Sequence, residues 1–383
     1  MTQTEACKRS HEIHTSERMS FRGCRRRWNW IFIDNYYPIE TPKPLEFGTA
    51  YHKAMEAYYN PSTWQWHEKE ETRQMLELRA IKIFVDKCES QKAKYLSRTD
   101  RERLDEDVAT DYTERVELGI GMLKYYFSIA PPLDKFKTLS TEQQFTVPVI
   151  NPDTGEQLLC QCGKPIVYDG RIDMLCEDEF GDYWIFDWKT ARSIQTDDTF
   201  LYLDDQITSY CWALQMVLGI KVRGFIYHEQ KKSFPVPPKE NKFRRKGCLY
   251  SVSKNQDCTE EMYREWVMEH DVEAYEAGLY DGILLYLHED GAPFYRRSQI
   301  HRTQTELESA ARNIFLEAKE MYRPDLPIYP SPGRFACGFC AFRQPCLGKN
   351  DGSDYQYTLD TLFETREPYY LRDRELSSDK NRG

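Results

Sequence analysis

The stretch DGRIDMLCEDEFGDYWIFDWKTA, residues 169–191, constrains the fold more than any other part of the chain. Two strand-forming runs flank the turn-forming residues EFGD, which predicts a β-hairpin. In that hairpin Asp173 lies on the first strand and Asp187 near the end of the second, so both carboxylates meet at one end of the sheet. The two-residue period of a strand places Lys189 on the same face as Asp187 and Trp188 on the opposite face.

Charged residues at the end of an apolar strand indicate a functional site. Two carboxylates a few ångströms apart repel each other unless a cation lies between them, and oxygen ligands suit Mg²⁺ or Mn²⁺. A lysine beside them would stabilise negative charge on a phosphate or orient the attacking water. The pattern therefore favours phosphodiester hydrolysis. The alternative for this spacing alone is an Asp/Lys pair on a hairpin surface.

Three other segments supply candidate side chains for the same site. Gln206 and Tyr210 are four residues apart in a predicted helix, so they share one face. His52, in the helical segment GTAYHKAMEAYY, is a candidate imidazole ligand of the metal. Glu142, where the strand-like pattern begins, would add another carboxylate.

These residues carry a family resemblance. The motifs GRID (170–173), WIFDWKT (184–190) and QITSY (206–210) resemble the core motifs of PD-(D/E)XK nucleases, and GTAYHKAME (48–56) resembles the histidine motif of the RecB-like exonuclease branch. The resemblance implies that His52, Asp173 and Asp187 bind metal, that Lys189 is catalytic, and that Gln206 and Tyr210 support the site. Many relatives carry Glu where this chain has Asp187, but both occur in the superfamily.

The fold that this resemblance implies is α/β, a restriction-endonuclease-like core with a mixed central sheet flanked by helices. We expect one nuclease domain over residues 1–350, with a helical insertion at about 60–135 and a catalytic core at about 140–230. Residues 351–383 are expected to form a polar, weakly ordered tail.

A group of cysteines near the C-terminus forms a second candidate metal site. The segment CGFCAFRQPC contains Cys337, Cys340 and Cys346, and Cys24 in SFRGCRRRW is the best candidate for a fourth ligand. The arrangement resembles that of CRISPR-associated exonucleases and a subunit of AddAB enzymes, in which such cysteines bind a 4Fe–4S cluster. The cluster would join the two ends of the domain. A structural Zn²⁺ on four thiolates is the alternative.

The remaining cysteines receive simpler interpretations. We expect no disulfides if the compartment is reducing. Cys160 and Cys162 would form a second site or none, and the following Gly163 favours a hairpin end over a ligand pair. Cys7 and the other cysteines are interpreted as small buried or surface residues.

Charge is uneven along the chain. The formal net charge is −10, yet residues 8–27 carry a net charge of +5. The simplest interpretation is a solvated helix face. If the cysteines join the termini, Arg25, Arg26 and Arg27 would lie beside the core and contact DNA phosphates, as would Arg296 and Arg297.

No apolar run approaches the roughly 18 residues of a membrane helix, and the first 20 residues have no apolar centre, so we expect a cytoplasmic protein. The sequence thus predicts a Mg²⁺- or Mn²⁺-dependent DNA exonuclease that degrades DNA from its ends and prefers single strands. Its task would be DNA repair, recombination, or phage or CRISPR DNA processing. The alternatives are a non-catalytic DNA-binding subunit and an endonuclease subunit of a larger complex. No GxxxxGK(S/T) motif is present, so a helicase partner would be a separate protein.

Overall fold

A mixed sheet forms the centre of the molecule. The structure, a computed structural model, describes residues 10–39, 43–64, 69–99, 106–194, 197 and 199–367. Within them a six-stranded sheet has the order β1-β4-β5-β6-β9, and β3 also pairs with β4. Strands β1 and β4 are parallel, as are β5 and β6, and the other pairs are antiparallel. The strands are β1 (Glu12–Ile13), β3 (Phe136–Pro148), β4 (Val167–Asp178), β5 (Tyr183–Ala191), β6 (Val222–Lys231) and β9 (Tyr295–His301).

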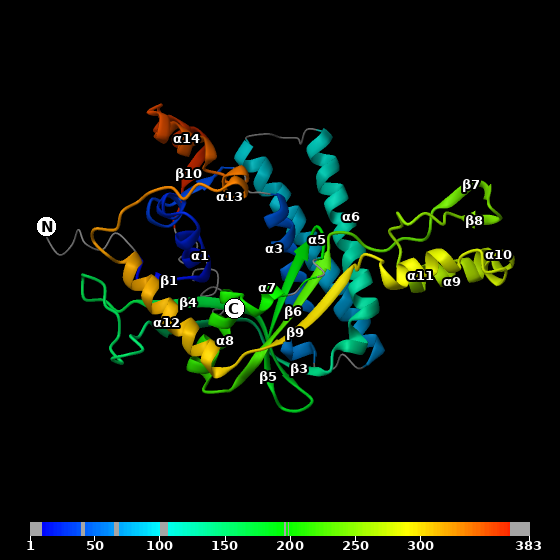
Figure 1. Cartoon of the computed structure of the whole chain (residues 1–383), viewed down its shortest axis with the longest axis horizontal. Coiled ribbons are helices and arrows are strands. Elements are labelled where there is room, and N and C mark those ends of the chain that lie inside the picture. The colour runs from blue at the N-terminus through cyan, green and yellow to red at the C-terminus, as the bar shows by residue number, and fades with distance from the viewer. Residues whose placement is uncertain are drawn as a thin grey trace.

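Helices cover both faces of this sheet (Figure 1). One core lies under α1, α8 and α12 and includes Ile185 of β5. The other lies under α3, α5 and α6 and includes Phe186 and Trp188 of the same strand. Because β5 is apolar on both faces, it is buried between two helical layers, as expected for a central strand. The covering helices are α1 (Thr15–Gly23), α8 (Asp205–Leu218) and α12 (Gln304–Met321) on one side, and α3 (Lys43–Tyr58), α5 (Glu70–Thr99) and α6 (Glu106–Ile129) on the other.

The chain is therefore a mixed α/β protein with a central sheet flanked by helices, as the sequence predicted. The segment expected to be a helical insertion contains α5 and α6. Gly119 of α6 lies so close to α5 that an added Cβ would be 2.0 Å from the ring of Phe84. Two short elements flank these helices, α4 (Pro61–Trp64) and the 3-10 helix η3 (Pro131–Leu133).

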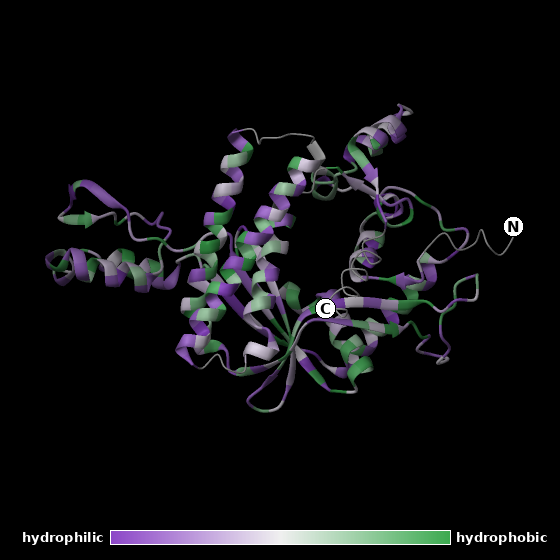
Figure 2. Cartoon of the chain, turned by 180° about the vertical axis from the view of Figure 1, so that it is seen from behind, coloured by the Kyte–Doolittle hydropathy of each residue, from purple (hydrophilic) through white to green (hydrophobic). Residues whose placement is uncertain are grey.

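A second insertion, between β6 and β9, projects from one end of the sheet (Figure 1). It has its own small core, which includes Tyr263, Tyr280 and Leu284. The polar segment KENKFRRKG contains a strand, coloured hydrophilic in Figure 2, and the helical segment that follows is interrupted at Asp271. The elements are β7 (Glu240–Arg245), β8 (Cys248–Tyr250), α9 (Glu260–His270), α10 (Val272–Glu276) and α11 (Asp281–Glu289).

Segments from both ends of the chain pack together beside α1. Strand β10 pairs antiparallel with β2, and Trp30, Phe342 and Phe363 share a small core. The expectation of a weakly ordered tail is thus wrong for residues 355–365, which form a helix and a strand. Residues 368–383 lie outside the described part of the chain. The elements are α2 (Arg25–Trp28), the π-helix η2 (Asn29–Ile33), β2 (Tyr36–Pro38), α13 (Arg334–Gly338), α14 (Arg343–Asp351), α15 (Tyr355–Leu362) and β10 (Phe363–Thr365), with α7 (Thr199–Tyr202) elsewhere, before α8.

Candidate active site

The expected hairpin is formed by β4 and β5. The two strands pair antiparallel with Met174 opposite Phe186. This register brings Asp173 to the end of β5, where the backbone N–H of Trp188 donates a hydrogen bond to Asp173 Oδ2 at 2.9 Å. Asp173 and Asp187 therefore lie at the same end of the hairpin. The sequence spacing predicted this arrangement correctly.

The face alternation of β5 is also as predicted. Lys189 Nζ lies 2.6 Å from Asp187 Oδ2, so the two charges share one face. Trp188 is only 1% exposed and stacks on Tyr59 of the opposite core, with ring centroids 5.5 Å apart. The buried indole anchors the end of the strand, while its neighbours present charge.

His52 reaches the site from α3. Its Nδ1 lies 3.3 Å from Asp173 Oδ2, and its side chain is about a quarter exposed. The apolar face of α3 contributes Tyr51, Ala54 and Met55 to the core, each with no exposed surface. Because that face fixes the rotation of the helix, His52 is held over the end of the hairpin.

The pKa values of His52, Asp173, Asp187 and Lys189 depend on one another. Burial would raise the pKa of Asp173, but His52, Lys189 and the Trp188 N–H hold it below its ordinary value. Burial raises the pKa of Asp187, and the neighbouring Asp173 carboxylate raises it further, although Lys189 opposes both. Burial would lower the pKa of Lys189, but Asp187 and Asp173 raise it, so the ammonium stays charged. The pKa of His52 is raised by Asp173 against the effect of burial.

The donor set fits a hard divalent cation. Two carboxylates and one imidazole converge, and oxygen-rich sets of this kind suit Mg²⁺ or Mn²⁺. The side chain of Asp187 is only 9% exposed, and within the described part of the chain its Oδ2 makes no hydrogen bond of good geometry despite the nearby Lys189. A cation held by His52, Asp173 and Asp187 would satisfy that oxygen and relieve the carboxylate repulsion.

Glu142 occupies a different position from the one expected. Strand β3 begins at Phe136, so Glu142 lies within the strand and not at its start, and its backbone has a φ of 52°. Its carboxylate pairs with Arg171 at 2.8 Å and lies 3.8 Å from Lys53. Burial raises its pKa, against the two cations. The Glu142 carboxylate is therefore paired with two cationic side chains of the protein, and we do not include it among the proposed metal ligands.

An open cleft of about 550 Å³ gives access to the site. Gln206 and Tyr210 of α8 line it, and Gln206 Nε2 donates to the Tyr210 hydroxyl at 3.3 Å, so the predicted i, i+4 pair is formed. Sequence reasoning missed two cationic lining residues, Lys53 and Arg171. Both had a signal: Lys53 follows His52, and Arg171 is two residues before Asp173 on the same strand face.

The four cysteines of the second candidate site line one cavity of about 280 Å³ between α2, α13 and α14. Three of the sulfurs accept hydrogen bonds at 3.4 Å, from the backbone N–H groups of Ser331 and Gly333 and from the Arg26 guanidinium. N–H donors around sulfur are a feature of thiolate metal centres. The cysteines are Cys24, Cys337, Cys340 and Cys346.

The predicted DNA-binding arginines differ in their surroundings. Arg25 pairs with Glu320, and Arg26 donates to Asn350 at 2.7 Å, while Arg27 lines the cysteine cavity. The other two are held inside the protein: Arg296 Nε donates to Glu229 at 2.9 Å, and Arg297 pairs with Asp134 at 2.9 Å. The side chain of Arg297, on strand β9, is only 14% exposed and paired with Asp134, so it is not available for contacts with DNA phosphates.

Comparison with protein families gives a match over most of the chain. The family model described as the PD-(D/E)XK nuclease superfamily matches residues 15–347, which include all the cleft-lining residues except His14 and all four cysteines of the second site. A search of the curated proteins found no match. Among the described helices, none combines the length and the apolar character needed to cross a membrane.

Proposed function

This chain belongs to the PD-(D/E)XK nuclease superfamily, and on that premise we propose that it is a Mg²⁺- or Mn²⁺-dependent DNA exonuclease of the RecB-like branch. The observation that carries the proposal is the convergence of His52, Asp173, Asp187 and Lys189 at one end of the β4–β5 hairpin. The exonuclease mode is supported by the resemblance of the His52 and Gln206–Tyr210 motifs to those of RecB-like exonucleases.

When bound, the divalent cation would lower the pKa of a water molecule and stabilise charge on the phosphate. His52, Asp173 and Asp187 would hold it. Lys189, kept charged by its carboxylate neighbours, would place an ammonium beside the phosphate oxygen on which negative charge develops. The Gln206 amide and the Tyr210 hydroxyl would hold the phosphate or the lysine in position.

The substrate would be held mainly through its backbone. Lys53 and Arg171 line the cleft beside the acidic residues and would contact phosphates on either side of the scissile bond. Such contacts do not depend on sequence and weaken as salt is added. We propose DNA ends, preferably single-stranded, as the substrate, and DNA repair, recombination, or phage or CRISPR DNA processing as the setting, with a helicase or other protein of that pathway as the partner.

For the second site we propose a 4Fe–4S cluster on Cys24, Cys337, Cys340 and Cys346, with a structural Zn²⁺ as the alternative. Support comes from the single cavity that all four line and from the N–H groups that donate to the sulfurs. Its role would be to join α1 and α2 to the C-terminal helices. Iron and acid-labile sulfide in anaerobically purified protein would indicate the cluster, and zinc without iron would indicate the alternative.

The experiment that tests the activity is degradation of end-labelled DNA in Mn²⁺ by anaerobically purified protein. Linear single strands, linear duplexes and closed single-stranded circles are compared for the wild type, Lys189→Ala and the matched control Lys221→Ala. Lys221 is exposed and precedes β6 at the opposite end of the sheet from Lys189.

We expect wild type and Lys221→Ala to degrade linear DNA and spare the circles, and Lys189→Ala to be slower by about 10²- to 10³-fold, as for loss of one charge-stabilising donor. Cleavage of the circles would replace the exonuclease by an endonuclease. If all three proteins bind DNA and none of them cleaves it, the alternative of a non-catalytic DNA-binding subunit would be favoured.

A further inference from the structure

A third group of potential metal ligands lies apart from the active-site cleft and the four-cysteine cavity. It is at the tip of the hairpin that precedes β4. The sequence CQCGK forms a tight turn, which agrees with the hairpin end that the sequence predicted: the Gly163 N–H donates to the Cys160 carbonyl at 2.8 Å, and the Cys160 N–H to the Lys164 carbonyl at 2.8 Å. Gly163 has a φ of 81°, which favours glycine at this position. The turn places Cys160 and Cys162 on the same short loop.

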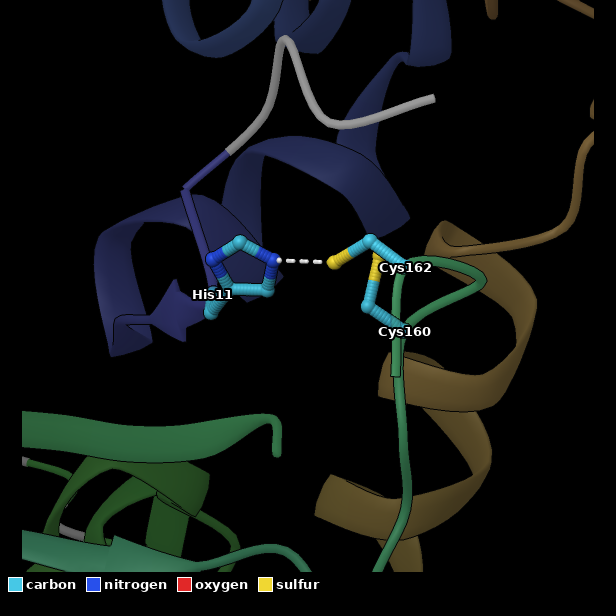
Figure 3. A group of neighbouring side chains, drawn as sticks. All are labelled: His11, Cys160 and Cys162. Carbon is cyan, nitrogen blue, oxygen red and sulfur yellow. Dashed lines mark hydrogen bonds between the residues drawn. The ribbon is translucent and has the colours of Figure 1, made fainter. Parts of the chain in front are cut away.

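Strand β1 brings a histidine to this loop. The Val167 N–H at the start of β4 donates to the His11 carbonyl at 2.9 Å, and Glu12 then pairs with Val167 in parallel register. His11 Nε2 lies 3.1 Å from Cys162 Sγ. Figure 3 shows the imidazole directed at that sulfur, with Cys160 beside it. The three ligand atoms all lie within 4.8 Å of one another.

We propose that His11, Cys160 and Cys162 form a structural Zn²⁺ site in the reduced protein. Zn²⁺ prefers tetrahedral sets of thiolate and imidazole, at about 2.3 Å to sulfur and about 2.0 Å to nitrogen. In such a tetrahedron the ligand atoms are about 3.6 to 3.8 Å apart, so the observed cluster needs only small side-chain shifts. His11 is 149 positions from Cys160 and 151 from Cys162 in the sequence, and the pairing of β1 with β4 brings it to them.

The oxidation state of Cys162 decides whether the site forms. Cys162 is disulfide-bonded, which corrects the expectation of no disulfides. A metal takes the thiolate, so disulfide and Zn²⁺ compete for one sulfur. A phosphine reductant and one water convert the disulfide to two thiols and yield the phosphine oxide. Each thiol that then binds Zn²⁺ releases its proton.

The three ligands leave one tetrahedral position. A water molecule would occupy that position, as it does in zinc sites with three protein ligands.

The site would anchor the N-terminal end of α1. Helix α1 begins at Thr15, four residues after His11, and Thr15 hydrogen-bonds Tyr168 of β4 at 2.6 Å. His14, Thr15 and Met19 line the active-site cleft. Helix α1 ends at Gly23, directly before Cys24 of the other metal site. Zn²⁺ on His11 would therefore hold one end of a helix whose other end is held by Cys24.

The test is zinc content, measured by plasma mass spectrometry on full-length protein purified with the phosphine. Wild type is compared with Cys160→Ser/Cys162→Ser and with the control Cys258→Ser, a buried thiol in the small insertion core. We expect the double variant to lose one zinc per chain and keep its iron. Cys337→Ser should lose metal from the other site and keep this zinc.

Cobalt gives a second measurement that does not need a variant. Co²⁺ added to reduced, zinc-free wild type should give the visible bands of tetrahedral thiolate coordination, and His11→Ala should shift them. Cys162→His replaces the thiolate with an imidazole, which also binds Zn²⁺, so this variant should retain zinc. It is the control for loss of zinc through misfolding of the serine variants. The inference is overturned if reduced wild type holds no zinc beyond that lost in Cys337→Ser, or if the double variant, folded by circular dichroism, binds as much zinc as wild type.

Discussion

A buried histidine in the central sheet should lower the free energy of unfolding of the protein at acid pH. His228 of β6 has no exposed surface and lies among aromatic rings, with centroids 4.6 Å from Tyr295 and 5.0 Å from Tyr126. Among the residues that the structure describes, neither ring nitrogen has a hydrogen-bond partner. Burial lowers the pKa of His228 well below its ordinary value, and the nearby Arg297 guanidinium lowers it further. The folded protein therefore holds this imidazole neutral.

The size of the effect follows from linkage. The folded-state pKa is lowered, so the stability is fully present above the unfolded pKa of about 6.5 and is lost as the pH falls below it, because only the unfolded chain then binds the proton. The loss is RT ln(1 + 10^(6.5 − pH)), which is about 0.1 kcal/mol at about pH 7.5 and about 2 kcal/mol at about pH 5. His228→Phe removes the titrating group and keeps an aromatic ring in an aromatic site.

Urea unfolding of wild type and His228→Phe at about pH 7.5 and about pH 5 measures this contribution. We expect the free energy of unfolding of the variant, relative to wild type, to rise by about 2 kcal/mol at the lower pH. Any constant effect of the substitution cancels in this double difference, as do the other titrating groups. A difference that does not change with pH would refute the reasoning, since it would mean that His228 is protonated in the folded protein or accessible to water.

Two further predictions concern packing and buried charge. Gly119→Ala should lower the free energy of unfolding by about 1 to 3 kcal/mol in urea, because its Cβ would enter the ring of Phe84; the control Gly282→Ala, with nothing within 4 Å, should be neutral or slightly stabilising. Arg18→Met should cost about 3 kcal/mol, because a fully buried guanidinium that pairs with two carboxylates is lost. Arg22→Met, which removes a 41% exposed partner of the same carboxylates, should cost less than about 1 kcal/mol in the same assay.

The parts of the fold that local pattern specifies were predictable. The β4–β5 hairpin and helix α8 each carry their own period and turn or cap: Asp204 caps the start of α8, and Gly219, with a φ of 65°, ends it. The spacing of Asp173, Asp187, Lys189, Gln206 and Tyr210, the candidate site residues, lies within the hairpin and this helix. It is therefore readable from about 40 consecutive residues, 169–210.

Elements that exist only through long-range pairing were missed. Strand β1 has two residues and forms because Val167 and Tyr168 are there to pair with it. Strand β10 likewise forms against β2, across more than 300 residues. Neither has a period of its own, because two or three residues cannot show one. The hairpin end at Cys160 and Cys162 was predicted, but the nearby His11 was not, because the pairing of β1 with β4 is what brings it there.

The position of His52 shows why the active site was still identifiable. Its distance of 3.3 Å from Asp173 depends on how α3 packs, and no local pattern fixes a contact between residues 121 positions apart. What the sequence does contain is the apolar face of α3 and the two apolar faces of β5, and these leave few ways to pack. Once Trp188 is buried against Tyr59, directly after α3, the helix crosses the end of the hairpin and its histidine lies beside the Asp173 carboxylate. The charged residues of the site are therefore positioned by the apolar residues between them.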